Sequence, residues 1–396
     1  MLIHYDHYKK LTMDPYYKEV KTILEDKGSL YLAGMVIHSL EEWWLHESEK
    51  KRVIDISKLY ANLPRAFRLM HCALYAAMAR DLGDETRYDL CSSQNGNVWS
   101  VVSAVNGWAS STGLPTILSS THIREVYHLV CFHNNGEQVL APSLGLSLEL
   151  AHTTIQGLRI QDVLEPYPSF YVLVPEGMEM RVYNELTGWH KAEGIYLARD
   201  RSKDLNGWQF MIVGKSKSED PLDNALFYSW LGDKKGTNPT IEEACNAALQ
   251  HFLDPTKSKG PWPQVAYDRN AERWADAMRW LFNVVFYVTS TDAEVDIRHP
   301  SSEYRNLEER LKKAKGTKAE KLKERMRSFS RRKYRYLGNS TKRTPGVDME
   351  NKVVHVPGHW QHYWEGKGEE KQRIRKRKRP YFYGKGEHTR SVLKIP

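Results

Sequence analysis

The sequence predicts an α+β protein with a strongly basic C-terminal end. Amphipathic helical segments occur near both ends of the chain, a group of short aromatic and β-branched segments lies in the middle, and Lys and Arg accumulate after residue 300. We therefore expect a mixed α+β N-terminal domain at 1–165 and an antiparallel sheet with packed helices at 166–299. A region at 300–396 is expected to combine a basic helical hairpin with a small C-terminal β-hairpin.

The N-terminal segment combines predicted helices with a predicted β-hairpin. Apolar residues recur at helical spacing in SLYLAGMVIHSLEEWWLHES, and again in LPRAFRLMHCALYAAMARDLG, where Pro64 suits a first turn and Gly83 a stop. In EVYHLVCFHNNGEQVLAP, two strand-like runs flank Asn135 and Gly136, a dipeptide typical of hairpin turns. We expect a strand on either side of that turn.

The middle of the chain predicts a sheet. The segments PSFYVLVP, AEGIYLAR, WQFMIVGK and NALFYSWLG carry Gly or Pro near their ends and indicate antiparallel strands between about Ser169 and Leu231. The tryptophans of this region, Trp189, Trp208 and Trp230, either line a peptide-binding groove or belong to the sheet core, which is the commoner place for such side chains.

Helices follow the sheet. Thr240 and Glu243 form a capping-box pattern at the start of TIEEACNAALQHFL, and AERWADAMRWLFNVVFYVTS has one apolar side. The composition then shifts to SEYRNLEERLKKAKGTKAEKLKERMRSFSRRKYRYLG, which predicts a helical hairpin whose second arm begins at the pair Thr317 and Glu320.

The charge of the chain is unevenly distributed. Residues 301–396 carry 28 Lys and Arg against 11 Asp and Glu, a net charge of +17. Since the whole chain has 58 basic and 49 acidic residues, residues 1–300 carry 30 and 38, a net charge of −8. An acidic body suits a protein partner, and a basic end suits a polyanion or is only a solvated tail.

Composition argues against several classes of protein. Hydrophobic residues make up 41% of the chain, and there are 12 Trp, which argues against global disorder. The cysteines, Cys72, Cys91, Cys131 and Cys245, form no CxxC pair, so neither a zinc ribbon nor a disulfide framework is indicated. The sequence shows no apolar signal core and no membrane-spanning stretch, and we expect a cytoplasmic protein of a bacterial host cell without a membrane partner.

The stretch from Val353 to His388 places a dense basic block among aromatic residues. Lys and Arg neutralise phosphates, and aromatic rings stack on unpaired bases. The block from Arg373 to Arg379 is predicted to form a strand of a hairpin, with one face on the aromatics and one face free. We predict that RNA, or alternatively DNA, is bound by Arg331, Arg332, Lys333, Arg335, His359, Trp360, Trp364, Arg373, Arg375, Lys376, Arg377, Lys378, Arg379, Tyr381 and Tyr383.

A metal site would need ligands that this stretch does not complete. His355, His359 and His362 are spaced like residues on one face of a helix, but a Pro-Gly pair interrupts them, and Glu365 is the carboxylate nearby. We expect no metal site and no cofactor.

A Cys and His pair raises the possibility of nucleophilic catalysis. Cys72 on a predicted helix and His128 on a predicted strand follow an order that resembles transglutaminase-like and other papain-type folds. In such folds the next strand supplies an acidic residue, but near that position this sequence has Ala141. Cys72 also lies within an apolar run, where a thiol is usually part of the core. We therefore expect Cys72 to be structural and predict no catalytic residue.

The C-terminal stretch resembles a motif of proteins from phages, plasmids and other bacterial mobile elements. These proteins commonly end in Val-x-Gly-His-Trp, a basic spacer and Pro-Tyr-x-x-Gly, which here are Val356 to Trp360 and Pro380 to Gly384. The segments PYPSFYVLVP, FYVTSTDAEVDI and YRYLG are similar to that group too, so the resemblance extends from about Pro166 to the end.

The motif also departs from the group. Gln361 stands where an Arg usually follows His-Trp, and Lys378 and Arg379 stand where a Trp usually precedes Pro-Tyr. One branch of the group comprises the type V-A anti-CRISPR proteins, which lower production of the CRISPR effector nuclease. The resemblance implies recognition of the effector polypeptide as it is made, followed by loss of its messenger RNA.

The function favoured by these patterns is that of a mobile-element regulator and anti-defence inhibitor. Its body is expected to bind a host protein or nascent polypeptide, with a CRISPR effector or a ribosome as candidates, and its basic end is expected to bind RNA. One alternative is a nuclease or other enzyme that uses His355, His359 and Glu365, or Cys72 with His128. Another is a DNA-binding or virion-associated structural protein. The sequence leaves the oligomeric state open.

Overall fold

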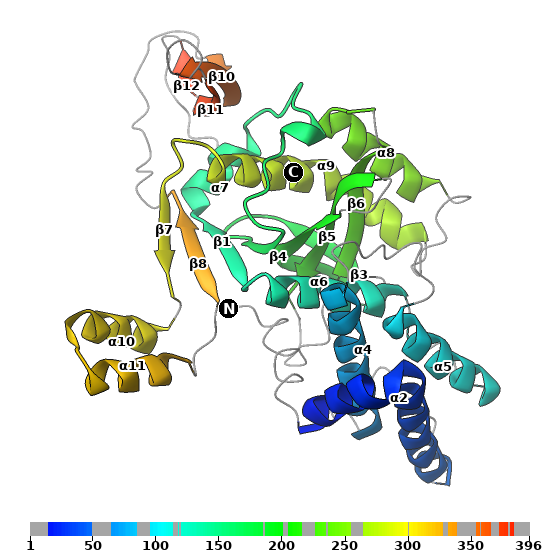
Figure 1. The fold of residues 1–396 in the computed structure, drawn as a ribbon. Coiled ribbons are helices and arrows are strands. Elements are labelled where there is room, and N and C mark those ends of the chain that lie inside the picture. Colours follow the sequence, from blue (N-terminus) through cyan, green and yellow to red (C-terminus); the bar gives the residue numbers. More distant parts are fainter. Residues whose placement is uncertain are drawn as a thin grey trace.

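The computed structural model describes most of the chain. The described residues are 15–49, 65–84, 96–113, 118, 120–184, 187–200, 205–215, 226–234, 237–254, 264–299, 301–327, 332–338, 354–356, 358–365, 372–378 and 381–383. They form an α+β fold, as the sequence predicts, with helices on both sides of one large sheet (Figure 1).

The central sheet has eight strands among the described residues. These are β1 (Gln138–Pro142), β2 (Ser169–Leu173), β3 (Arg181–Asn184), β4 (Gly188–Asp200), β5 (Leu205–Gly214), β6 (Leu226–Lys234), β7 (Val295–Arg298) and β8 (Lys333–Leu337). Their order is β6-β5-β4-β2-β1-β8-β7, and β3 pairs with β4. The antiparallel pairing of β2, β4, β5 and β6 confirms the sheet predicted between residues 169 and 231.

Strand β1 makes the sheet a mixed one. It runs parallel to β2 and to β8, with Val139 opposite both Tyr171 and Tyr334. Parallel neighbours need a crossover connection, and α7 (Leu144–Ala151) with the 3₁₀ turn η1 (Ile160–Asp162) lies in the connection from β1 to β2.

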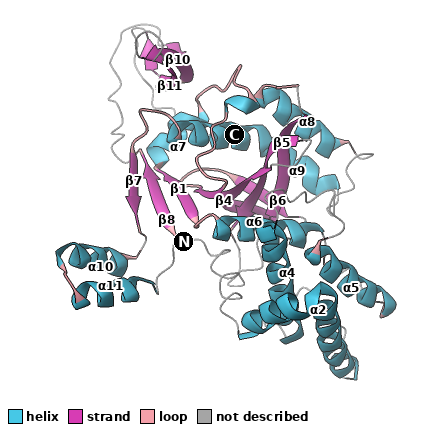
Figure 2. Ribbon diagram, viewed as in Figure 1, coloured by secondary structure: helices cyan, strands magenta, loops and turns pink. Residues whose placement is uncertain are grey.

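Helices build a core on each face of the sheet (Figure 2). The first core contains α2 (Pro15–Glu49), α4 (Arg65–Asp84), α5 (Asn97–Ser111) and α6 (Ser120–Asn134), and the second contains α7, α8 (Ile241–Leu253) and α9 (Gln264–Val288). Alternate side chains of β4 enter the two cores, Tyr196 the first and Ile195 the second. Trp208 is fully buried in the second core, so it is a core residue rather than part of a groove.

The hairpin predicted around Asn135 and Gly136 is wrong in its first arm. That run is the helix α6, in which buried apolar residues recur at positions i, i+3 and i+7 from Ile123. Gly136 has a φ of 78°, and its N–H donates to the carbonyl of His133 at 3.1 Å. The Asn-Gly pair therefore ends a helix through a left-handed cap instead of joining two strands.

The predicted basic helical hairpin is confirmed, but it ends earlier than expected. Its arms are α10 (Ser302–Lys313) and α11 (Thr317–Arg327), whereas residues 333–337 form β8 between β1 and β7. Tyr334 enters the first core and Leu337 the second, which is the alternation of a buried strand. One sheet thus takes strands from all three of the predicted segments.

None of the described helices combines the length and the hydropathy needed to cross a membrane.

Candidate nucleic-acid interface

The predicted basic hairpin is present as two antiparallel strands. β10 (His359–Glu365) pairs with β11 (Gln372–Lys378), and beside it β9 (Val354–Val356) pairs with β12 (Tyr381–Tyr383). Since side chains alternate along a strand, the hairpin has two different faces. The inner face carries Trp360, Arg375 and Arg377, and the outer face carries Tyr363, Ile374, Lys376 and Lys378.

Trp360 fixes the inner face to helix α9. Its indole Nε1 donates to Oδ1 of Asn283 at 2.7 Å, and its ring lies 5.7 Å from the ring of Phe286. Asn283 is fully buried, and its Nδ2 donates to the carbonyls of Leu150 and Thr153 at 2.9 and 2.7 Å. A single buried amide thus joins β10, α9 and the end of α7.

Arg375 forms the second attachment of the inner face. Its guanidinium donates from Nη1 to the carbonyl of Asp162 and from Nη2 to Oγ1 of Thr289, each at 3.0 Å, and lies 4.1 Å from the centre of the Phe286 ring. Burial lowers the pKa of Arg375 to about 10, and the charge of Asp162 opposes this shift. The side chain stays cationic at neutral pH.

Arg377 forms the third attachment and points to the same side of β11 as Arg375. Its Nη2 donates to Oε2 of Glu149 on α7 at 2.7 Å, and its guanidinium lies 5.5 Å from the ring centre of Tyr287. Arg375 and Arg377 are therefore held by protein partners, and each is less than a tenth exposed. This corrects the expectation that both are open to phosphate.

The outer face presents the accessible cations of the hairpin. A groove of about 450 Å³ is lined by Asp292, Tyr363, Glu365, Ile374, Lys376 and Lys378, and is also touched by Arg377, whose guanidinium belongs to the inner face. Nζ of Lys378 lies 5.5 Å from the ring centre of Tyr363, and Nζ of Lys376 lies 3.7 Å from Oε1 of Glu365. This face combines an aromatic ring with two ammonium groups, the groups that stack on a base and neutralise phosphates.

Two other predicted residues lie at the central sheet, Arg332 just before β8 and Arg335 on it. Arg332 is buried and forms an ion pair with Glu137, with Nε and Oε2 3.6 Å apart. Arg335 donates to Oε1 of Gln138 and lies 4.4 Å from the ring centre of Tyr167, and burial lowers its pKa. The structure does not bring these arginines into the hairpin.

The remaining predicted residues are described only in part. Arg331 and Arg379 are not described, and His359 is half-buried at the start of β10. The backbone is described, but not the side chain, for Lys333, Trp364, Arg373, Tyr381 and Tyr383.

The groups proposed for a nuclease are not brought together in the part of the chain that the structure describes. His359 and Glu365 lie at opposite ends of β10, which at about 3.3 Å per residue separates them by about 20 Å. The side chain of His355 lies outside the described set. No group of three or more His, Cys, Asp and Glu side chains placed to hold a metal ion occurs among the described residues.

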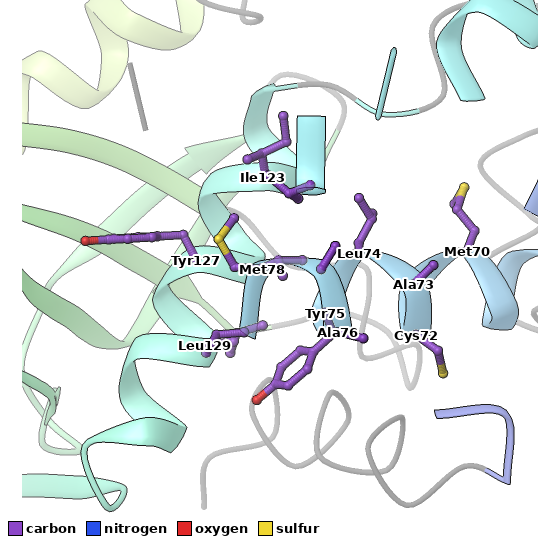
Figure 3. Close-up of a cluster of buried hydrophobic side chains, with 14 of the residues drawn as sticks. Met70, Cys72, Ala73, Leu74, Tyr75, Ala76, Met78, Ile123, Tyr127 and Leu129 are labelled. Atoms are coloured by element: carbon purple, nitrogen blue, oxygen red, sulfur yellow. The ribbon is translucent and has the colours of Figure 1, made fainter. Parts of the chain in front are cut away.

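Cys72 and His128 are both core residues. Cys72 on α4 is fully buried in the first core, part of which Figure 3 shows. His128 lies on the helix α6 and not on a strand, stacked 6.3 Å from Tyr228. Burial, with a smaller contribution from Arg124, lowers the pKa of His128 to about 3. At neutral pH such an imidazole is too weak a base for general-base catalysis.

Sequence reasoning missed the residues that receive the hairpin. Glu149 on α7, the carbonyl of Asp162, and Asn283 and Thr289 in and after α9 are more than 70 positions from their partners on β10 and β11. The only available signal was the alternation of the basic block, which indicates two faces without saying which face is buried.

Comparison with known proteins gives the chain a family. None of the curated proteins matches it. A crystal structure of AcrVA2 aligns with 12% identity over 78% of this chain and 93% of that chain, at a TM-score of 0.42. The model of the AcrVA2-like family, described as the anti-CRISPR type V subtype A2 family, matches residues 140–385. Since this match spans more than half of the 396 residues, the chain belongs to the AcrVA2-like family of type V subtype A2 anti-CRISPR proteins.

Proposed function

We propose that this anti-CRISPR protein lowers production of a type V effector by binding two partners. The body binds the effector polypeptide as it is made, and the outer face of the β10–β11 hairpin binds RNA. Family membership supports the first partner. The observation that carries the second is the outer-face groove, where Tyr363 lies beside Lys376 and Lys378.

The charges of the two parts suit these partners. Residues 1–300 have a net charge of −8, which does not favour a polyanion, whereas residues 301–396 have a net charge of +17. The aromatic ring favours a single strand, because unpaired bases expose their faces for stacking. A single-stranded segment of messenger RNA is therefore the proposed nucleic-acid ligand of the hairpin.

The RNA part is tested by removing the outer-face cations. Lys376→Ala with Lys378→Ala should reduce the dependence of log K on log salt by about 1–1.5 units for single-stranded RNA. The matched control, Lys18→Ala with Lys191→Ala, removes two exposed charges from the body and should leave the slope unchanged. Equal slopes for the wild-type protein and the hairpin variant, measured by fluorescence anisotropy, would refute RNA binding at this face.

The protein part is tested by co-purification from bacteria that produce a type V effector. The tagged protein should retain effector polypeptide even after RNase treatment. It should retain the effector's messenger RNA only when RNase is omitted. Retention of DNA instead of RNA would favour the DNA-binding alternative. Failure to retain any effector polypeptide would refute recognition by the body.

A further inference from the structure

The helical hairpin α10–α11 separates its charges onto two sides. Among the side chains of the hairpin that the structure describes, Leu307 and Leu322 are the buried ones, so they mark the line along which the two helices pack. At about 100° per residue, one side of the pair carries Arg310, Lys313, Lys318, Lys321 and Arg325, and we name these five residues the basic face. All five are exposed.

The carboxylates of the hairpin leave this face almost free. Glu309 and Glu320 pair with Lys312 and Lys323 on the opposite side, at 2.6 and 2.9 Å, and Glu309 also interacts electrostatically with Lys313. Glu303 is the carboxylate on the basic face, and it pairs with Arg325 across the two helices at 2.5 Å. This cross-hairpin pair also confirms that both residues lie on the same side.

The remaining four cations of the basic face form no ion pair among the described residues. Arg310, Lys313, Lys318 and Lys321 have no carboxylate within ion-pair distance among the described residues. Glu309 interacts electrostatically with Lys313, whereas the other three cations are near no carboxylate that the structure pairs with them in its described part. Four exposed cations on one surface can attract an anion with several charges.

The hairpin is also placed to meet a large ligand. It lies beyond the ends of β7 and β8, away from the helices that cover the central sheet (Figure 1). We infer that the basic face of α10–α11 binds the phosphate backbone of double-stranded RNA, separately from the β10–β11 hairpin. This inference rests on the proposed function, in which the nucleic-acid ligand is RNA.

The spacing of the basic face suits a duplex. Lys318 and Arg325 are seven residues apart, or about 10 Å along the helix, and packed helices lie about 8–10 Å apart. Double-stranded DNA carries about one phosphate per 1.7 Å of its axis with both strands counted, so about six phosphates surround a duplex segment of this length, and a patch on one side meets a part of them.

The composition of the face argues against a protein partner. None of its five residues is aromatic or aliphatic, whereas protein interfaces are depleted in Lys and are built around apolar and aromatic residues. It also offers no ring for stacking on an unpaired base. Contact with a duplex through phosphates alone needs neither feature.

The test compares two triple variants of the full chain with equal charge. The basic-face variant is Lys313→Gln, Lys318→Gln and Lys321→Gln, and the control is Arg305→Gln, Lys312→Gln and Lys323→Gln on the opposite side. Gln has nearly the helix propensity of Lys, so both should keep the wild-type circular dichroism spectrum. The probe is an RNA duplex of about 16 base pairs, the length that double-stranded RNA-binding domains span.

For binding of the RNA duplex, the slope of log K against log salt should become about 2–3 units less steep in the basic-face variant. In the control variant it should change by less than about one unit. Equal losses in both variants, or an unchanged slope in the basic-face variant, would overturn the inference. The variant Lys376→Ala with Lys378→Ala separates the two proposals, because it should weaken binding of single-stranded RNA and leave binding of the duplex unchanged. If that variant binds like the wild type while the basic-face variant does not, the β10–β11 proposal fails and the α10–α11 inference stands.

Discussion

Arg375 and Lys376 are neighbours on β11 with opposite surroundings, so they form a matched pair for a test of how the hairpin is held. Replacing either by Ala removes one positive charge. Arg375→Ala also removes two hydrogen bonds at 3.0 Å and a guanidinium 4.1 Å from Phe286. Hydrogen bonds from charged groups contribute about 1.5–3 kcal/mol each and a cation–π contact about 0.5–2 kcal/mol, while burial of the cation offsets part of this gain.

We expect Arg375→Ala to lower the free energy of unfolding by about 2–4 kcal/mol. Lys376→Ala should lower it by less than about 1 kcal/mol, since its ion pair with Glu365 is exposed to solvent. Arg375→Lys should recover only part of the loss, because an ammonium cannot reach both acceptors as the planar guanidinium does.

The assay is chemical denaturation followed by circular dichroism, combined with hydrogen exchange of the β10–β11 amides. Exchange is needed because the hairpin can detach while the central sheet stays folded. Similar unfolding free energies and similar exchange for Arg375→Ala and Lys376→Ala would refute the conclusion that the inner face anchors the hairpin.

Three further predictions concern the cores and metal content. His128 stays neutral down to about pH 3 when folded but takes a proton below about pH 6.5 when unfolded, so stability should fall by about 2 kcal/mol from pH 7 to pH 5. His128→Phe should flatten that profile in pH-dependent denaturation, and an equally steep profile would contradict the assignment. Cys72→Ser buries a hydroxyl and should cost about 1–3 kcal/mol while anti-CRISPR activity persists, and loss of activity at unchanged melting temperature would contradict a structural role. Purified protein should contain no stoichiometric zinc by elemental analysis, and one zinc per chain that disappears in His359→Ala would contradict this.

Local patterns predicted those elements whose determinants are close in sequence. The capping box at α8 is present with both of its bonds, Thr240 N–H to Glu243 Oε2 at 2.7 Å and Glu243 N–H to Thr240 Oγ1 at 3.1 Å. The antiparallel strands, α9 and the α10–α11 hairpin are present for the same reason, because periodicity and turn residues act within a few positions.

Local patterns gave wrong predictions where the same short sequence occurs in two kinds of structure. Asn-Gly suits both a hairpin turn and a left-handed helix end, and α6 shows the second use. The sequence predicts a helix for the Tyr-rich end of the basic segment, but this end is the strand β8, because pairing with β1 and β7 satisfies its backbone.

The sequence by itself determined the α+β class, the concentration of positive charge after residue 300, and the two-faced strand from Arg373 to Arg379. Only the tertiary structure decided which of its cations are available to a ligand. Arg375 and Arg377 face Asp162, Thr289 and Glu149, whereas Lys376 and Lys378 face outward. The physical reason is that alternation specifies which side chains share a face, but burial depends on acceptors that the fold brings from more than 80 positions away.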